Sequence, residues 1–276
     1  MIFQRNFFQV WFQGCQNLQN EDFKENIEKW KFLNPTWKYN CIDDKFLQKS
    51  CLEFSKECFE IYKQLPTIMK IDLGRYIVLY LYGGAYADMD IYPMKKLNNS
   101  RYVKNLINEY ENNNNHVMGL SLFNTTLLES FVLVQDSIFI NNAIMFSSPK
   151  NPSLKRFIEN TLITLKDSIQ RKIDLNAFIN ITNLSGPNSV NYFFKNKKNV
   201  HDTKLIYFPN TVFESCDSNK NCNITSDTIG IHLYSHSWVS EPMATFFNIY
   251  SKAKPLLQFI PLVLILVVFY FIYKRK

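Results

Sequence analysis

Residues 67–97 read TIMKIDLGRYIVLYLYGGAYADMDIYPMKKL, and this stretch decides the fold. Its first half is apolar on nearly all sides, Pro66 precedes it, and Gly83 and Gly84 follow it. Proline favours the first turn of a helix and glycine favours its end. The pattern therefore predicts a helix that is buried on most faces, followed by a short strand at residues 85–87.

The predicted strand ends at Asp88-Met89-Asp90. In an extended chain, residues two apart point the same way, so both carboxylates can face one hard cation. Mg²⁺ and Mn²⁺ prefer oxygen ligands and share their coordination shell with phosphate oxygens. Because apolar segments flank the triplet, uncompensated charge there would cost several kcal/mol. We therefore expect a metal site that a bound diphosphate completes.

Asp72 and Arg75 lie three residues apart on the predicted helix, so they share a face, which the apolar pattern directs into the protein. Buried charges require partners. Two interpretations follow from the residues alone. The pair is either a structural salt bridge, or Asp72 binds sugar hydroxyls while Arg75 supports a donor or the metal site.

The joint spacing of Asp72, Arg75, Gly83-Gly84, Asp88 and Asp90 resembles the hallmark segment of glycosyltransferase family 32, the DXD sugar-binding family. Fungal α-mannosyltransferases, inositol phosphorylceramide mannosyltransferases and bacterial capsular sugar transferases belong to that family. Further blocks resemble it in order: FQVWFQG at 8–14, NPTWKYN at 34–40, NNAIMFSSPKNPSL at 141–154, GPNSVNYFF at 186–194 and IHLYSHSW at 231–238. The resemblance implies an α/β fold of GT-A type with a mostly parallel central sheet, and nucleotide at the carboxyl ends of its strands.

The same resemblance implies roles for individual residues. The catalytic set is Asp72, Arg75, Asp88 and Asp90. The donor-binding set is Trp11 near the base, Asp72 and Arg75 at the sugar, Gly84, Asn142 in the sugar pocket, and Trp238 closing over the donor. The metal ligands are Asp88, Asp90 and His232, with His236 as the competing choice. Phe8 departs from the family pattern, because members often have histidine there.

The reaction that the resemblance implies is a retaining transfer of a hexose, dependent on Mn²⁺ or Mg²⁺. GDP-mannose is the first expected donor and a UDP-hexose the next, and the acceptor is a glycan or glycolipid at a membrane. Two alternatives stay open: an inactive, membrane-tethered module that binds nucleotide sugar, and a nucleotidyl or phosphoryl transferase that uses the Asp pair. The second alternative calls for a phosphate-binding GxxxxGK[ST] loop or a third clustered acid, and the sequence has neither.

Length and composition favour one catalytic domain, which we place at residues 1–251. With 276 residues, 46% of them hydrophobic, the chain can bury one sizeable core. The net charge of +7 is a mild excess without a basic stripe, so we expect no nucleic-acid partner. The cysteines lack the spacing of a zinc site. Cys216 and Cys222 could either bridge in an oxidising lumen or remain thiols.

Residues 256–273, LLQFIPLVLILVVFYFIY, carry no charge. At about 1.5 Å per residue a helix of this length spans roughly 27 Å, close to the hydrocarbon thickness of a bilayer. The segment therefore predicts a single C-terminal transmembrane anchor, with a basic tail at 274–276. The expected location is an internal membrane of the ER or Golgi type, with the facing of the domain left open.

Overall fold

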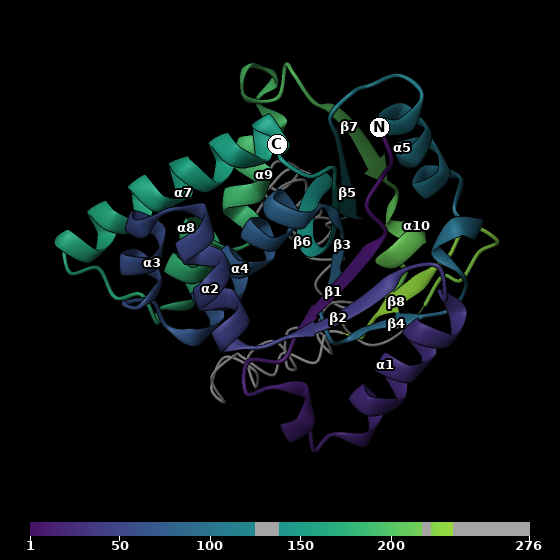
Figure 1. The fold of residues 1–276 in the computed structure, drawn as a ribbon, viewed down its shortest axis with the longest axis horizontal. Coiled ribbons are helices and arrows are strands. Elements are labelled where there is room, and N and C mark those ends of the chain that lie inside the picture. Colours follow the sequence, from purple (N-terminus) through teal and green to yellow (C-terminus); the bar gives the residue numbers. More distant parts are fainter. Residues whose placement is uncertain (125–137, 217–221, 234–276) are drawn as a thin grey trace, which may run out of the picture.

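The computed structural model describes residues 1–124, 138–216 and 222–233. Its centre is a six-stranded sheet in the order β2-β1-β3-β6-β5-β7, with a small second sheet of β4 and β8 beside it (Figure 1). The strands are β1 (Asn6–Val10), β2 (Lys38–Ile42), β3 (Gly84–Ala87), β4 (Ile91–Pro93), β5 (Val117–Asn124), β6 (Ile138–Ser147), β7 (Lys204–Phe208) and β8 (Gly230–His232).

Most neighbours in the central sheet are parallel. Strand β1 pairs in parallel with β2 and β3, and β5 pairs in parallel with β7. Strand β6 runs antiparallel to both of its neighbours, β3 and β5. The α/β GT-A-like fold with a mostly parallel sheet is therefore confirmed, and the carboxyl ends of β1 and β3 meet at one edge.

Helices cover both faces of this sheet, and Figure 1 shows the two layers. One layer contains α2 (Asp44–Phe54), α3 (Lys56–Tyr62), α4 (Thr67–Tyr82), α7 (Pro152–Gln170), α8 (Phe178–Leu184) and α9 (Pro187–Lys195). The other contains α1 (Glu21–Leu33), α5 (Arg101–Glu111) and α10 (Asn210–Phe213). Successive strand residues alternate between the layers, as the pleat requires: Phe8 packs with the first group and Phe7 with the second.

The helix predicted from residues 67–97 is α4, and it ends where the glycines are. Pro66 precedes its first residue, and Gly83 follows it with φ of 63°. Gly84 opens β3 with φ of 111°, and a Cβ there would collide with the backbone carbonyl of Asn6 on β1. Glycine at 84 therefore lets β3 lie against β1, which fixes where the following residues emerge.

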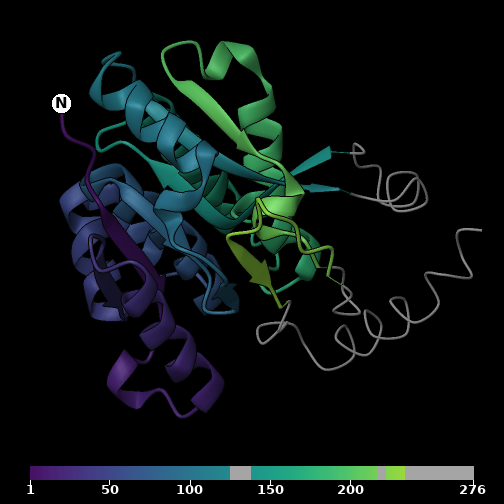
Figure 2. The same cartoon turned by 90° about the vertical axis from the view of Figure 1, so that its right-hand side faces the viewer.

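Strand β6 carries an irregularity that matters for the site. Leu120 of β5 pairs with Met145, but the next residue, Ser121, pairs with Asn141, so residues 142–144 bulge out of register. Figure 2 shows β5 and β6 continuing past this point, beyond the helical layers. Bulges re-aim the side chains beside them. Here the bulge begins at Asn142, opposite the carboxyl end of β3.

Two disulfides tie loops of the described chain. Cys15 pairs with Cys41, joining the segment after β1 to β2. Cys216 pairs with Cys222, which resolves the alternative that the sequence left open. Cys51 and Cys58 are buried free thiols.

The membrane anchor is the prediction that needs correction. Among the residues described, no helix combines the length and the apolar surface needed to cross a bilayer. The longest helix of the described residues, α7, has 19 residues but is amphipathic, with an apolar inner side and charged residues such as Lys155 and Lys166 on its outer side. The predicted anchor at 256–273 and tail at 274–276 lie outside the described residues. The transmembrane helix and the membrane location are therefore unsupported.

Candidate active site

The two carboxylates of the DxD triplet lie at the carboxyl end of β3 and face different partners. A turn closes behind them, since the Ile91 amide donates to the Asp88 carbonyl at 3.1 Å. The Asp88 side chain turns towards α4 and accepts hydrogen bonds from Arg75 of α4 and from Tyr86 of β3. The Asp90 side chain turns towards β8, where it lies beside His232. We call the first group, Asp72, Arg75, Tyr86, Asp88 and Asn142, the Arg75 cluster, and the second, Asp90, Asn141, Glu214 and His232, the His232 cluster.

Arg75 is the centre of its cluster and is 3% exposed. One guanidinium nitrogen, Nη2, lies 3.1 Å from Asp72 Oδ1 and 3.3 Å from Asp88 Oδ1. The other, Nη1, donates to Asp88 Oδ2 at 3.3 Å and to the Asn142 carbonyl at 2.9 Å. The ring of Tyr86 lies 4.7 Å from the guanidinium carbon. A single buried cation thus holds α4, β3 and the bulge of β6 together.

Asp72 is 4% exposed and fully engaged on its inner side. Asn142 Nδ2 donates to its Oδ1 at 3.1 Å, and Ser185 Oγ donates to its Oδ2 at 3.0 Å. Burial raises the pKa of Asp72 from 3.8 to about 6, although Arg75 and these hydrogen bonds oppose the rise. The Tyr76 hydroxyl, one helical turn after Asp72 on α4, accepts a hydrogen bond from Asn142 Nδ2 at 2.9 Å. Asn142 therefore links Asp72 and Tyr76.

Asp88 keeps part of its carboxylate in contact with solvent, with 28% of the side chain exposed. Tyr86 donates to its Oδ1 at 2.6 Å. Burial raises the pKa of Asp88, Arg75 counteracts this, and the neighbouring Asp90 adds to it. A carboxylate placed between a fixed cation and a second carboxylate can accept a further positive charge on its open side.

The His232 cluster brings together four separate parts of the chain, at residues 90, 141, 214 and 232. His232 of β8 pairs with Ile91 of β4. The backbone amide of the next residue, Leu233, donates to the Asp90 carbonyl at 3.0 Å. Its Nε2 lies 3.5 Å from Asp90 Oδ1, and its Nδ1 lies 2.9 Å from Glu214 Oε2. Burial alone would lower the pKa of His232, but Glu214 and Asp90 outweigh it and hold that pKa well above its usual value.

The backbone of the DxD turn is held from β1 and α1. Gln9 Nε2 donates to the Asp88 carbonyl at 3.0 Å. Asn26 Nδ2 donates to the Met89 carbonyl at 2.6 Å and to the Ile91 carbonyl at 3.0 Å, and Trp30 Nε1 shares the latter at 3.0 Å. These side chains satisfy carbonyls that the end of the strand would leave unpaired, and they fix the turn that presents both carboxylates.

The remaining residues predicted from the sequence take varied places. Trp11 follows β1 at the same sheet edge, packs against Phe23 and Met89, and its buried Nε1 has no hydrogen-bond partner among the described residues. Asn142 lies in the Arg75 cluster. Gly84 stands at the opposite end of β3 from Asp88. His236 and Trp238 lie outside the described residues.

The sequence reasoning missed several members of the network. Tyr76 and Tyr86 could have been found, because one lies a helical turn beyond Asp72 and the other two strand residues before Asp88. Asn141 is the sequence neighbour of Asn142, which was predicted for the sugar pocket. Ser185 and Glu214 had no local pattern to mark them, since both reach the site only through tertiary packing.

The residues fit a divalent cation in their chemistry. The two clusters hold four carboxylates, Asp72, Asp88, Asp90 and Glu214, against two basic groups, Arg75 and His232. A histidine that binds a cation is neutral, so a divalent cation would offset most of the negative charge that Arg75 leaves unbalanced. Within the stretches that the structure describes, no three His, Cys, Asp or Glu side chains gather into a ready-made metal site. Sites of the Mg²⁺ type commonly use only one or two carboxylates, and substrate phosphates supply the rest.

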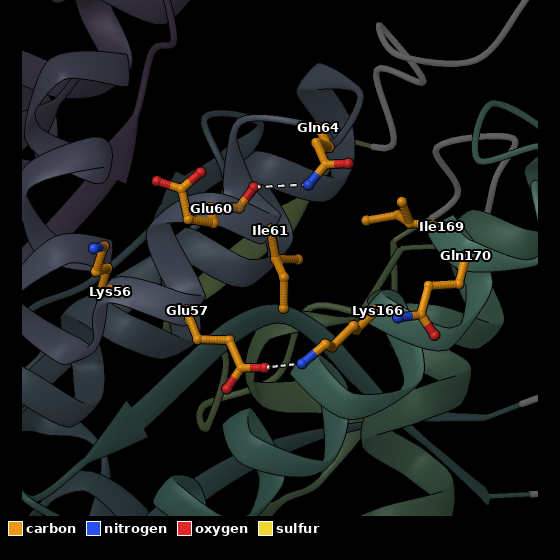
Figure 3. A pocket seen from close by; sticks show the side chains of 8 residues that line it. All are labelled: Lys56, Glu57, Glu60, Ile61, Gln64, Lys166, Ile169 and Gln170. Carbon is orange, nitrogen blue, oxygen red and sulfur yellow. Dashed lines mark hydrogen bonds and ion pairs between the residues drawn. The ribbon is translucent and has the colours of Figure 1, made fainter.

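A hollow on the surface elsewhere lacks such chemistry. It lies between α3 and α7 and is lined by Ile61, Ile169 and an exposed ion pair of Glu57 with Lys166 (Figure 3). It contains no buried polar side chain, whereas both clusters at the DxD turn do. We therefore assign the candidate site to the carboxyl end of β3.

Comparison with known proteins gives the family to which this part of the sequence is similar. The family described as "Glycosyltransferase sugar-binding region containing DXD motif" matches residues 20–112, which include Asp72, Arg75, Asp88 and Asp90. The resemblance predicted from the sequence is thereby confirmed, and the enzyme class is that of a glycosyltransferase.

Individual relatives extend the match. An uncharacterized glycosyltransferase of Acanthamoeba polyphaga mimivirus is 25% identical over 244 residues, which cover 83% of this chain and 81% of that protein. The initiation-specific alpha-1,6-mannosyltransferase of Candida albicans is 26% identical over 126 residues, 43% of this chain and 32% of that protein. The catalytic domain of alpha-toxin from Clostridium novyi superposes with a TM-score of 0.50 at 12% identity, covering 90% of this chain and 83% of that one, and this likeness concerns the fold alone.

Proposed function

We propose that this glycosyltransferase moves a hexose from a nucleotide sugar to a glycan acceptor, with retention of configuration and with Mn²⁺ or Mg²⁺ bound at the DxD turn. The observation that carries the proposal is the convergence of Asp72, Arg75 and Asp88 in one hydrogen-bonded cluster at the carboxyl end of β3. Open α/β sheets bind nucleotides at that edge.

The donor sugar would meet Asp72. An ionised carboxylate has about four lone-pair sites, and Arg75, Asn142 and Ser185 use three of them. One site is left for a sugar hydroxyl, and the surrounding donors fix its direction. A preorganised acceptor of this kind needs no rearrangement when the bond to the leaving group stretches.

The leaving nucleoside diphosphate would meet the DxD turn. The bound cation supplies positive charge that stabilises the departing phosphates. Asp90 and His232 would hold it on one side, and the open side of Asp88 would hold it on the other. Arg75 adds a fixed positive charge behind Asp88 and keeps that carboxylate ionised when the substrate enters.

The nucleotide and the sugar are proposed from more distant support. Trp11 lies at the same sheet edge, with a buried indole N–H that a base could accept from. The Candida albicans relative is named a mannosyltransferase, so GDP-mannose is the first donor to test. UDP-galactose and UDP-glucose come next.

The experiment is a donor screen on the full chain. Release of GDP or UDP from each nucleotide sugar is measured with Mn²⁺, beside an Asp88→Asn/Asp90→Asn variant as the control. We expect metal-dependent release from one donor, lost in the control. Neither binding nor release of any donor by a demonstrably folded chain would defeat the proposal. Binding of a donor without release, even with glycan acceptors added, would favour an inactive binding module instead.

A further inference from the structure

Glu214 is a buried acid that the proposed reaction does not itself use. It caps the C-terminal end of α10, and none of its side chain is exposed. Leaving a carboxylate buried without partners would cost several kcal/mol. Among the described residues, its partners Asn141 and His232 come from two other segments of the chain, so its position requires an explanation.

Each oxygen of Glu214 has a different partner. Oε1 accepts from Asn141 Nδ2 at 2.9 Å, and Oε2 lies 2.9 Å from His232 Nδ1. Asn141 is itself fixed, because its Oδ1 accepts from the Ala143 amide at 3.2 Å within the β6 bulge. The amide of Asn141 can therefore present only its NH₂ group to Glu214. The other oxygen of the carboxylate, Oε2, lies against the imidazole and can accept the Nδ1 proton.

On the opposite side of the ring, Nε2 of His232 faces Asp90 at 3.5 Å. Neighbouring ligands of one octahedral cation with bonds of about 2.1 Å lie about 3 Å apart. The spacing of Nε2 and Asp90 Oδ1 is close to that value. Histidines that bind metals commonly donate their other N–H to a carboxylate, which sets the tautomer and the ring orientation.

We propose that Glu214 is a positioning residue that keeps the proton of His232 on Nδ1 and so directs the Nε2 lone pair to the cation beside Asp90. The inference rests on the proposed function, because that function places the cation there. It adds a residue that touches neither donor nor cation. It also gives Asn141 a role, since Asn141 fixes which oxygen of Glu214 serves the histidine.

Replacing Glu214 with glutamine separates positioning from simple packing, because the two side chains have nearly the same shape. In Glu214→Gln, the new amide meets the NH₂ group of Asn141 and must turn its oxygen towards it. Its own NH₂ group then faces His232 and donates to Nδ1. The imidazole proton moves to Nε2, where it blocks the cation.

A second change should restore the arrangement. In the double variant Asn141→Asp/Glu214→Gln, the new carboxylate at 141 accepts from the glutamine NH₂ group. The glutamine oxygen is then free to accept the Nδ1 proton of His232. The pair has the same total charge and nearly the same volume as the original. A merely structural role for Glu214 would not predict this rescue.

The measurement uses the full chain with Mn²⁺ and GDP or UDP, and it does not depend on turnover. The electron paramagnetic resonance of free Mn²⁺ gives the affinity. Electron spin echo modulation shows whether a ¹⁴N nucleus of an imidazole binds the ion, and its loss in His232→Gln assigns that nucleus. Glu109→Gln is the matched control, because Glu109 also accepts from asparagine side chains but is only partly buried, on α5 and away from the site.

We expect an imidazole coupling in the unmodified chain and in Glu109→Gln. In Glu214→Gln we expect the coupling to be lost and Mn²⁺ to bind about 10-fold to 100-fold more weakly. Both properties should return in the double variant. Coupling that persists in Glu214→Gln at unchanged affinity, or a double variant that stays impaired, would overturn the inference.

Two further outcomes separate this inference from the proposed function. Mn²⁺ that binds without any imidazole coupling would overturn the role of Glu214, while donor release could still proceed. Failure of the unmodified chain to bind Mn²⁺ beside either nucleotide would remove the metal from the proposed function, and this inference with it.

Discussion

The two carboxylates of the DxD triplet belong to two clusters that are built in opposite ways. Most of the Arg75 cluster comes from residues 72–88, a helix and the strand directly after it. The His232 cluster is assembled from β6, the end of α10 and β8. Two adjacent asparagines, Asn142 at the start of the bulge and Asn141 just before it, hold one cluster each. The difference teaches that one half of the site is determined locally and the other by tertiary packing.

The electrostatics differ as well. The Arg75 cluster contains a permanent cation between two carboxylates, whereas the His232 cluster contains a titratable one. A permanent cation suits a structure that must stay ionised before the donor arrives. A histidine can exchange a proton for a metal ion. We therefore expect the first cluster to dominate stability and the second to dominate cation binding.

The largest expected effect is that of Arg75→Leu. It removes the cation between Asp72 and Asp88 and leaves buried carboxylates unpaired, which typically costs about 3–5 kcal/mol. Urea unfolding measures that loss as a lower midpoint. Arg101→Leu is the control, because Arg101 forms an exposed ion pair with Asp227, and we expect no resolvable change. Similar midpoints for the two variants would contradict the central role of Arg75.

Between pH 4 and pH 7, the free energy of unfolding of Asp72→Asn should change relative to that of the unmodified chain by an amount on the order of 3 kcal/mol. The pKa of Asp72 rises from 3.8 to about 6 on folding, so the native state binds the proton more tightly than the unfolded one. The stability due to this group is therefore complete below about pH 4 and is lost as pH rises to about 6. Asparagine at position 72 has no ionisable group, so Asp72→Asn does not lose this stability as pH rises. Relative to the unmodified chain, the variant should gain stability between pH 4 and pH 7 while donor turnover stays abolished. Parallel stability curves for the two proteins would refute the shift.

The Arg75 cluster was largely predictable because its geometry follows from short-range periodicity. Asp72 and Arg75 share a helix face, and Gly83 and Gly84 fix the passage from α4 into β3. The side chain of Asp88 was expected to join that of Asp90, but it is shared with Arg75 and Tyr86. Period-two alternation gives the direction of a side chain and does not say which neighbour competes for it.

The His232 cluster was only partly predictable for the same physical reason. His232 was named by resemblance, but Glu214 follows a four-residue helix that no periodicity marks. The bulge that separates Asn141 from Asn142 arises from the pairing of β5 with β6, which residues near 141 do not encode. The anchor at 256–273 came from the hydropathy of one segment alone, without any packing argument.

The two asparagines provide the most direct comparison of the clusters. Asn142→Ala removes one donor each from Asp72 and Tyr76, and Asn141→Ala removes one donor from Glu214. We expect each to cost about 2 kcal/mol of stability. Their functional effects should differ: Asn142→Ala should raise the KM for the donor at unchanged Mn²⁺ affinity, and Asn141→Ala should weaken Mn²⁺ binding. Donor kinetics at saturating and limiting Mn²⁺ distinguish the two, and identical profiles would mean that the clusters act as one unit.

The smallest effect is expected for Ser185→Ala, which removes one hydrogen-bond donor to Asp72 of the Arg75 cluster. Ser185 Oγ donates to Asp72 Oδ2 at 3.0 Å, and this bond lowers the pKa of Asp72 against the larger effect of burial. Its loss should cost about 1 kcal/mol at neutral pH and raise the pKa of Asp72 further. Because the proposed reaction needs Asp72 ionised, the acidic limb of kcat/KM should move to higher pH, with activity recovered at alkaline pH. Ser189→Ala, which loses only a bond to the Gly186 carbonyl on α9, is the control. A uniform loss of rate at every pH would show that Ser185 supports the fold and leaves the ionisation of Asp72 unchanged.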